Sequence, residues 1–200
     1  INVVGVSHFM RMLNKAVEDL KAGRVLEGEE ETWNVSIELP IPAYIPDSYI
    51  PNSKDKINAY QKLSSADNHD YLKEIKSEFM EDYGKLPMEV NSLFKIIELK
   101  MLAKKAGLIN LKAETIPMSK DKEIVLSMSK KVKPANIINM LEYNPRWVIS
   151  GTKLKINIRD LGYDWFTGLV NSVDALAKRA KHAGEARAGK KSESSEEDEE

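Results

Sequence analysis

Four prolines within twelve residues constrain this chain more than any other feature of its sequence. They are Pro40, Pro42, Pro46 and Pro51. Each proline fixes its own φ at about −65° and pushes the preceding residue toward extended geometry, so a helix cannot run through the segment. Large side chains, among them Tyr44, Ile45 and Tyr49, stand between the prolines. We therefore expect a rigid crossing over residues 41–63 that packs on a core and joins a strand to a helix.

Composition allows one substantial core or two packed lobes, because 42% of the 200 residues are apolar and 30% are charged. The absence of cysteine excludes disulfides and thiolate metal sites, which fits a reducing compartment. No apolar run approaches the roughly 20 residues of a membrane helix, and no signal peptide is recognisable. Since the chain begins with Ile1, we expect it to be a piece of a longer protein.

Charge is distributed unevenly along the chain. Residues 192–200 hold six acids and no base. The whole chain has 30 basic and 31 acidic residues, so 25 acids and a net charge of +5 remain outside this tail. That surplus is too small to predict nucleic-acid binding by charge alone. The tail itself has the composition of a disordered segment.

Apolar residues in the first half follow the helical period after one short strand, in which Val35, Ile37 and Leu39 alternate with polar residues. We expect helices over residues 7–22, from Asn52 or Ser53 onward, from Asp67 or Asn68 to Gly84, and from Pro87 to Gly107. In the last three of these helices one face is expected to be buried. Its residues are Ile57, Tyr60 and Leu63 in the first of the three, Leu72, Ile75, Phe79 and Tyr83 in the second, and Val90, Leu93, Phe94, Ile97, Met101 and Leu102 in the third.

From residue 108 onward the apolar period changes to that of strands. The alternating apolar residues, expected to lie on the inward face, are Ile109, Leu111 and Ala113, and then Ile124, Leu126 and Met128. Two further apolar runs are Trp147 to Ile149, and Leu154, Ile156 and Ile158. Gly151 indicates a hairpin between the last two strands, a short helix is expected over residues 134–143, and Asp164 should cap a long final helix.

The sequence therefore predicts an α+β fold. Its N-terminal layer of antiparallel helices contains the proline-rich strand-to-helix segment, and a small β-sheet flanked by helices follows. We expect a domain over residues 1–182, with the helical layer over about 1–107 and the α/β part over about 108–182. Residues 183–200 form the charged tail.

Residues for catalysis, cofactor binding or metal binding are not recognisable in the sequence. The run from Gly184 to Lys191 imitates a phosphate-binding loop, but it has Lys191 where a hydroxyl residue is needed and lacks the flanking strand and helix. His8 has no second ligand at metal spacing, so we interpret it as a surface or packed histidine. We expect this chain not to be an enzyme.

Three groups of residues are candidate recognition surfaces. Lys130, Lys131 and Lys133 could meet phosphate, but no aromatic residue accompanies them and a solvated turn is favoured. Tyr44, Tyr49 and Tyr60 could anchor a partner, but core packing is favoured. Glu78, Glu81 and Asp82 end a helix, where negative charge opposes the helix dipole, so a cationic partner would stabilise them.

The sequence resembles a known family in several of these stretches. They are the proline segment from Leu39 to Pro51, the run Tyr60-Gln-Lys-Leu-Ser-Ser-Ala, the helix from Glu74 to Gly84 followed by Pro87, and the helix ending at Gly107. In these stretches the chain is similar to the C-terminal domain of the bacterial transcription-repair-coupling factors. The resemblance covers about residues 3–180.

The resemblance implies a cytoplasmic bacterial protein, an ATP-dependent double-stranded DNA translocase that releases RNA polymerase stalled at lesions and recruits the excision-repair protein UvrA. Its motor domains, which bind ATP and magnesium, would lie outside this chain. The C-terminal domain would pack on a UvrB-like module and mask its UvrA-binding surface, acting as a regulatory clasp.

Within this clasp the resemblance places Glu78 and Glu81 opposite arginines of the UvrB-like module, as partner-binding residues. It therefore implies the cationic partner that the helix dipole also favours. The alternative is a nucleic-acid or polymerase-binding module that acts through the weakly basic body of the chain and Lys130 to Lys133.

Overall fold

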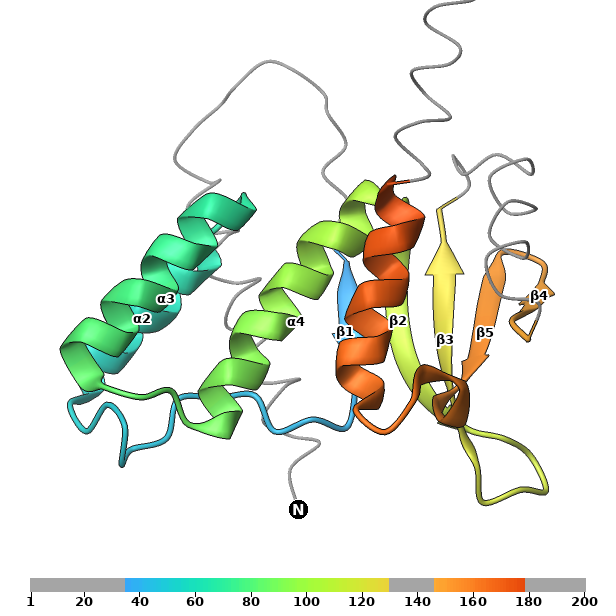
Figure 1. Ribbon diagram of the computed structural model, residues 1–200, viewed down its shortest axis with the longest axis horizontal. Coiled ribbons are helices and arrows are strands. Elements are labelled where there is room, and N and C mark those ends of the chain that lie inside the picture. The colour runs from blue at the N-terminus through green and yellow to red at the C-terminus, as the bar shows by residue number, and fades with distance from the viewer. Residues whose placement is uncertain (1–34, 130–145, 179–200) are drawn as a thin grey trace, which may run out of the picture. The chain divides into compact units, whose positions relative to one another are not determined.

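The computed structural model describes residues 35–129 and 146–178 (Figure 1). The chain divides into two compact units, the first ending at Met101 and the second beginning at Leu102. Several predictions lie outside the described residues. They are the helices over residues 7–22 and 134–143, the lysines at 130, 131 and 133, His8, and the tail that contains Gly184 and Lys191.

The proline segment packs on the core of the first unit, as predicted. It follows the short strand β1 (Ser36–Glu38), in which Ile37 is buried between two exposed residues. The buried side chains of the segment are those of Ile41, Ala43, Ile45, Tyr49 and Ile50. Buried and exposed residues alternate in the strand, and the prolines fix φ angles in the segment. Together these constraints place the apolar side chains of strand and segment against the helices.

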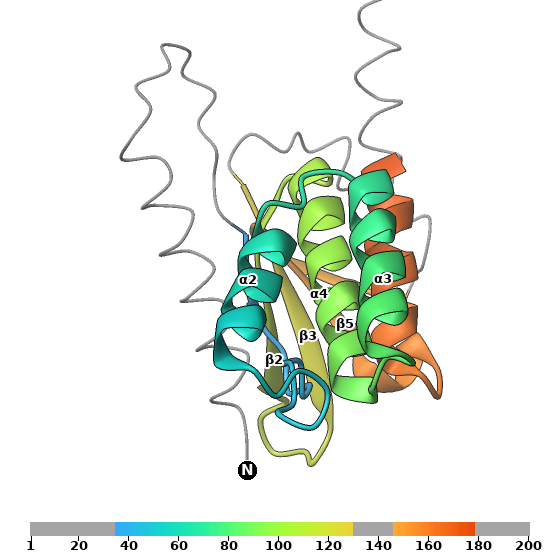
Figure 2. The same cartoon turned by 90° about the vertical axis from the view of Figure 1, so that its left-hand side faces the viewer.

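Three helices complete the first unit. They are α2 (Ser53–Ser64), α3 (His69–Tyr83) and α4 (Met88–Lys105), of which α4 belongs to this unit as far as Met101. Followed along the chain, α2 runs up, α3 down and α4 up (Figure 2). This arrangement confirms the predicted antiparallel layer.

Capping side chains set the helix ends. The side chain of Asn52 accepts hydrogen bonds from the first turn of α2, and that of Asn68 accepts from Tyr71 N–H at 2.8 Å. Gly84 ends α3 with a φ of 82°, which a side chain would strain. The sequence left two candidates for each of the two caps, and the structure chooses the asparagine in both.

The predicted buried face of α2 is wrong at one position. Ile57 is 53% exposed, whereas Ala59 and Leu63 are buried. Residues six apart lie about 120° apart around a helix. Ile57 and Leu63 therefore cannot both face the core, and the pair four residues apart does so instead.

Helix α4 is buried on more sides than predicted. Val90, Leu93, Phe94 and Ile97 are buried as expected, while Met101 and Leu102 are only half-buried. The further buried residues are Ile96, Leu99 and Ala103. A helix that is apolar around most of its circumference is typical of one that packs on several sides.

An antiparallel sheet forms the second unit. The strands of this sheet that belong to the second unit are β2 (Leu108–Thr115), β3 (Lys122–Met128), β4 (Val148–Ser150) and β5 (Lys153–Asn157). They are arranged in the order β2-β3-β5-β4. Ile124, Leu126, Leu154 and Ile156 are fully buried, as the alternating pattern predicts.

A β-bulge overturns the predicted inward position of Ile109. Leu108 pairs with Met128 but Asn110 pairs with Ser127, so the register shifts between them. The extra residue in β2 is Ile109, which is 38% exposed, while Leu108 and Leu111 are fully buried. A bulge reverses the side on which a residue points, and the alternating pattern alone does not reveal it.

The described residues after β5 pack closely within the second unit. Gly151 forms the predicted hairpin turn with a φ of 59°. Asp164 caps the helix over residues 165–178 by accepting from Thr167 N–H at 3.1 Å. In this helix Gly168 is required, because an added Cβ would lie 2.0 Å from the carbonyl oxygen of Leu161 in the short helix η1 (Ile158–Leu161). The α+β fold class is confirmed.

Candidate functional site

The last two turns of α3 carry the predicted partner-binding residues. Glu78 and Glu81 are both exposed, three residues apart and therefore on neighbouring positions of one helix face. The core-facing side of the helix is fixed, because Ile75 and Phe79 are buried and the Phe79 ring meets the Phe94 ring edge-on at 5.4 Å. The acids are consequently displayed by a helix that the core holds in place.

Tyr49 ties the proline segment to this helix end. Its hydroxyl lies 2.8 Å from the carbonyl oxygen of Phe79 and 3.1 Å from that of Gly84, and donates to these acceptors. Phe79 lies in the last turns of α3 and Gly84 directly follows the helix, so one buried hydroxyl ties both sides of this helix end to the proline segment. Burial raises the pKa of Tyr49, which keeps its hydroxyl protonated. The segment therefore secures the turn that displays the acids.

Tyr60 makes a second tie within the same unit. Its hydroxyl oxygen accepts a hydrogen bond from Ile45 N–H at 2.8 Å. Burial raises the pKa of Tyr60 as well. The interpretation of Tyr49 and Tyr60 as packing residues is supported, and Tyr44 is half-buried.

Glu78 already has a cationic partner inside the molecule. The ammonium group of Lys62 on α2 forms an ion pair with its carboxylate, and this hydrogen bond raises the pKa of Lys62. The last turn of α3 contains no basic residue, so Lys62 supplies the positive charge that the helix end lacks. The sequence pattern does not reveal this pair, because its members lie sixteen residues apart on different helices.

Glu81 and Asp82 form no ion pair within the part of the chain that the structure describes. Both are exposed, and they extend the negative charge of Glu78 to the end of the helix. The nearby apolar side chains are also accessible, since Met80 is 50% and Tyr83 36% exposed. The helix end thus combines carboxylates with apolar surface, a combination that suits a protein partner with cationic side chains.

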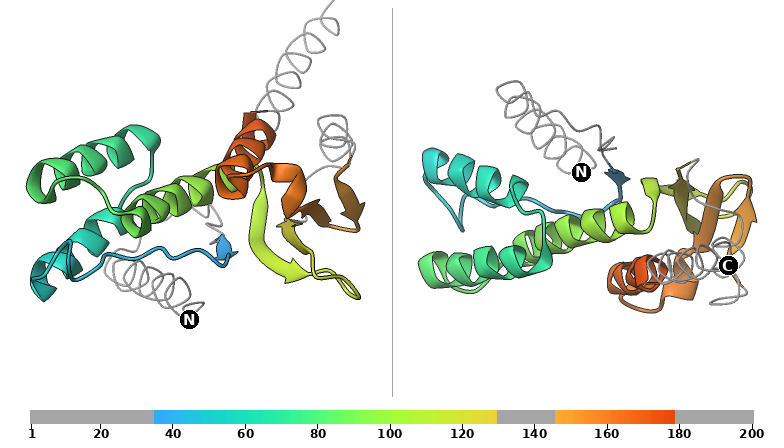
Figure 3. Two further views of the ribbon diagram at one scale, coloured as in Figure 1. Left: turned by 60° about the horizontal axis from the view of Figure 1, so that its bottom comes forward. Right: turned by 90° about the horizontal axis from the view of Figure 1, so that it is seen from above.

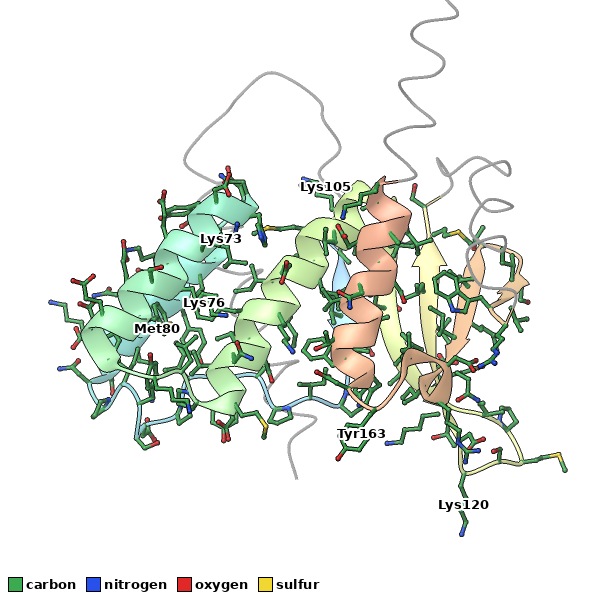
Figure 4. All side chains as sticks on the ribbon, viewed as in Figure 1. Lys73, Lys76, Met80, Lys105, Lys120 and Tyr163 are labelled. Atoms are coloured by element: carbon green, nitrogen blue, oxygen red, sulfur yellow. The ribbon has the colours of Figure 1, made fainter. Side chains whose placement is uncertain are left out.

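A different side of α3 has a mixed character. Lys73, Lys76 and Met80 follow one another along it (Figure 4). The ammonium group of Lys76 lies 6.0 Å from the centre of the Phe94 ring and 3.3 Å from the side-chain oxygen of Asn91. Lys76 is therefore engaged with α4, whereas Glu81 and Asp82 form no ion pair among the described residues.

Metal-binding groups of three or more histidines, cysteines or carboxylates are absent from residues 35–129 and 146–178. In the same ranges no helix is long and apolar enough to span a membrane. The expectation that this chain has no catalytic or cofactor site stays a prediction.

A comparison with solved structures identifies the fold of the domain. The crystal structure of the C-terminal domain of a transcription-repair coupling factor superposes with a TM-score of 0.62 at 21% identity, covering 74% of this chain and 95% of that chain. At this identity the likeness shows the fold: a helical unit with a proline-rich entry, joined to a small antiparallel sheet unit.

Comparison of sequences then gives the family. A family model of the TRCF domain matches residues 39–137, which include Glu78 and Glu81. Transcription-repair-coupling factors are 34% identical over 149 residues in Borreliella burgdorferi and 32% identical over 166 residues in Escherichia coli, covering 74% and 80% of this chain. The chain belongs to the TRCF domain family. It spans only 12% and 14% of the length of these two relatives.

Proposed function

We propose that this chain is the non-catalytic regulatory domain of a transcription-coupled DNA repair factor, and that it packs on a UvrB-like module and masks the UvrA-binding surface there. The whole protein would be an ATP-dependent double-stranded DNA translocase that releases RNA polymerase stalled at lesions. ATP and magnesium would then be bound by motor domains outside this chain. Membership of the TRCF domain family supports this proposal.

The observation that carries the proposal is the rigid display of Glu78 and Glu81. A helix whose other face is buried, and whose end is held by Tyr49, loses little conformational freedom when a partner binds. Its exposed carboxylates oppose the helix dipole, and Glu81 has no ion-pair partner among the described residues, so arginines of a partner would add favourable charge at this helix end.

The size of the effect follows from the kind of contact. Truncating one member of a desolvated, hydrogen-bonded charge pair costs about 2–5 kcal/mol. Each 1.4 kcal/mol corresponds to a tenfold change in an equilibrium constant. Loss of one pair would therefore shift the equilibrium between the masked and the open form by tenfold or more. Because Lys62 already pairs with Glu78, an arginine of the partner would share or displace this lysine.

The test is the double substitution Glu78→Lys with Glu81→Lys in the full protein. We expect higher affinity for UvrA and faster ATP turnover, because the mask opens. The matched control is Asp67→Lys with Asp70→Lys, which makes the same charge change at exposed positions at the start of the helix. Unchanged UvrA affinity in the first variant, or an equal rise in the control, would refute the assignment of these two residues.

A further inference from the structure

The loop between β2 and β3 presents an apolar side chain in a strained backbone conformation. Ser119 N–H donates to the carbonyl oxygen of Ile116 at 3.1 Å, which closes a turn with Pro117 and Met118 at its centre. Met118 has a φ of 62° and is the one non-glycine residue with positive φ among the described residues. Its side chain is fully exposed.

Local physics disfavours methionine at this position. A turn with proline at its first central position and positive φ at the second prefers glycine or asparagine there, because a Cβ crowds the backbone. An exposed methionine gains nothing from burial that would offset this strain. Strained positions of this kind are enriched in binding sites.

The loop is held firmly at its base. Ile116 N–H donates to the carbonyl oxygen of Asp121 at 2.9 Å, and Asp121 N–H donates to Ser119 Oγ at 3.0 Å. The Asp121 carboxylate lies 2.5 Å from the guanidinium of Arg159 in η1. Met118 is therefore presented on a pre-organised support, which lowers the entropy lost on binding.

The surroundings of Met118 are basic. Lys120 and Lys122 are exposed and form no ion pair within the described parts of the chain, while the charge of Asp121 is compensated by Arg159. The loop projects beyond the strands (Figure 3), and the fully exposed Tyr163 lies at the same end of the sheet unit as Lys120 (Figure 4). We call Met118, Lys120, Lys122 and Tyr163 the hairpin tip.

We propose that the hairpin tip is a docking site for another protein, in which Met118 enters an apolar pocket rimmed by carboxylates. The convex tip with one apolar side chain fits a concave pocket, and the two lysines without partners select an acidic rim. Nucleic acid fits less well. Sites for single strands combine a basic groove with several stacking aromatic residues, whereas the tip offers two free lysines and one tyrosine. This proposal does not depend on Glu78 or Glu81.

Photocrosslinking tests the proposal directly. The photoreactive residue p-benzoylphenylalanine replaces Met118 in the full protein in its native cells, and Ile57, an exposed apolar residue in the other unit, is the control position. We expect a protein crosslink from position 118 alone, mapping to an apolar pocket flanked by Asp or Glu. The variant Lys120→Glu with Lys122→Glu should lose it, and reversal of the mapped carboxylates to lysine should restore it.

A binding measurement with the mapped protein separates a docking role from a structural one. Met118→Gly removes the side chain and the backbone strain, so we expect a higher melting temperature together with at least tenfold weaker binding. Binding that is unaffected by this substitution would overturn the proposal. So would a crosslink no stronger than that from position 57, a crosslink to nucleic acid, or a mapped site without carboxylates.

Discussion

The proline-rich segment and the last turns of α3 meet at Tyr49, yet they use their side chains in opposite ways. The segment buries its large residues, with Ile45 and Ile50 at most 3% exposed. Helix α3 leaves Glu78 and Glu81 in solvent. Substitutions in the segment should therefore change the stability of the first unit, while substitutions at the acids should change binding and leave the fold intact.

Removal of the Tyr49 side chain should have the largest effect. We expect Tyr49→Ala to lower the free energy of unfolding by about 3–5 kcal/mol, because it leaves a cavity in the core. It also leaves the carbonyls of Phe79 and Gly84 without their donor. Urea denaturation followed by circular dichroism measures the loss.

Tyr49→Phe is the control for this substitution. It keeps the ring and its packing against Tyr83, whose centre lies 5.7 Å away, and removes only the hydroxyl. We expect a smaller loss of about 1–3 kcal/mol. If alanine costs no more than phenylalanine does, the ring is not part of the core and the contrast between the two regions fails.

Tyr60→Phe should cause the next largest loss of stability among substitutions that affect the segment. Ile45 is 3% exposed, and its N–H would lose the acceptor that lies 2.8 Å away. A buried donor without a partner costs about 1–3 kcal/mol. Tyr163→Phe is the matched control, because the Tyr163 ring is fully exposed, and it should leave the urea midpoint unchanged. Equal shifts in both variants would contradict the buried tie.

High pH should lower the stability of the first unit through Tyr49 and Tyr60. Burial raises the pKa of Tyr49 and of Tyr60 above the ordinary value of 10.0, so the folded state favours the protonated hydroxyls. This stabilisation is complete below pH 10.0 and is lost as the pH rises through the folded pKa values. The hydrogen bond to Glu78 raises the pKa of Lys62 and acts in the same direction.

Urea titrations from pH 8 to pH 12 check this dependence. Stability should decline toward the upper limit, and the decline should be shallower in Tyr49→Phe than in the unmodified chain, since one titrating hydroxyl is gone. A decline of equal steepness in both proteins would assign the alkaline transition to other groups.

Structural features that depend on neighbouring residues were predictable from the sequence, whereas features that depend on residues distant in the chain were not. The strand-to-helix crossing, the stop at Gly84 and the cap at Asp164 follow from local sterics and hydrogen bonding. The bulge at Ile109 and the pair between Lys62 and Glu78 depend on how separate elements meet. For the same reason the partner of Glu78 and Glu81 stays a prediction, because it would lie outside this chain.

Among these substitutions Glu81→Lys should change the free energy of unfolding least, and it should raise this free energy rather than lower it. Glu81 is exposed near the negative end of the α3 dipole, so a lysine there should raise the free energy of unfolding by about 0.3–1 kcal/mol. Asp70→Lys makes the same charge change in the first turn, where an acid is favourable, and should lower stability. Both shifts should shrink in 1 M salt, since screening weakens exposed charges. A loss of stability in both variants would show that Glu81 stabilises the isolated fold, and the acid would then need no partner to explain its place.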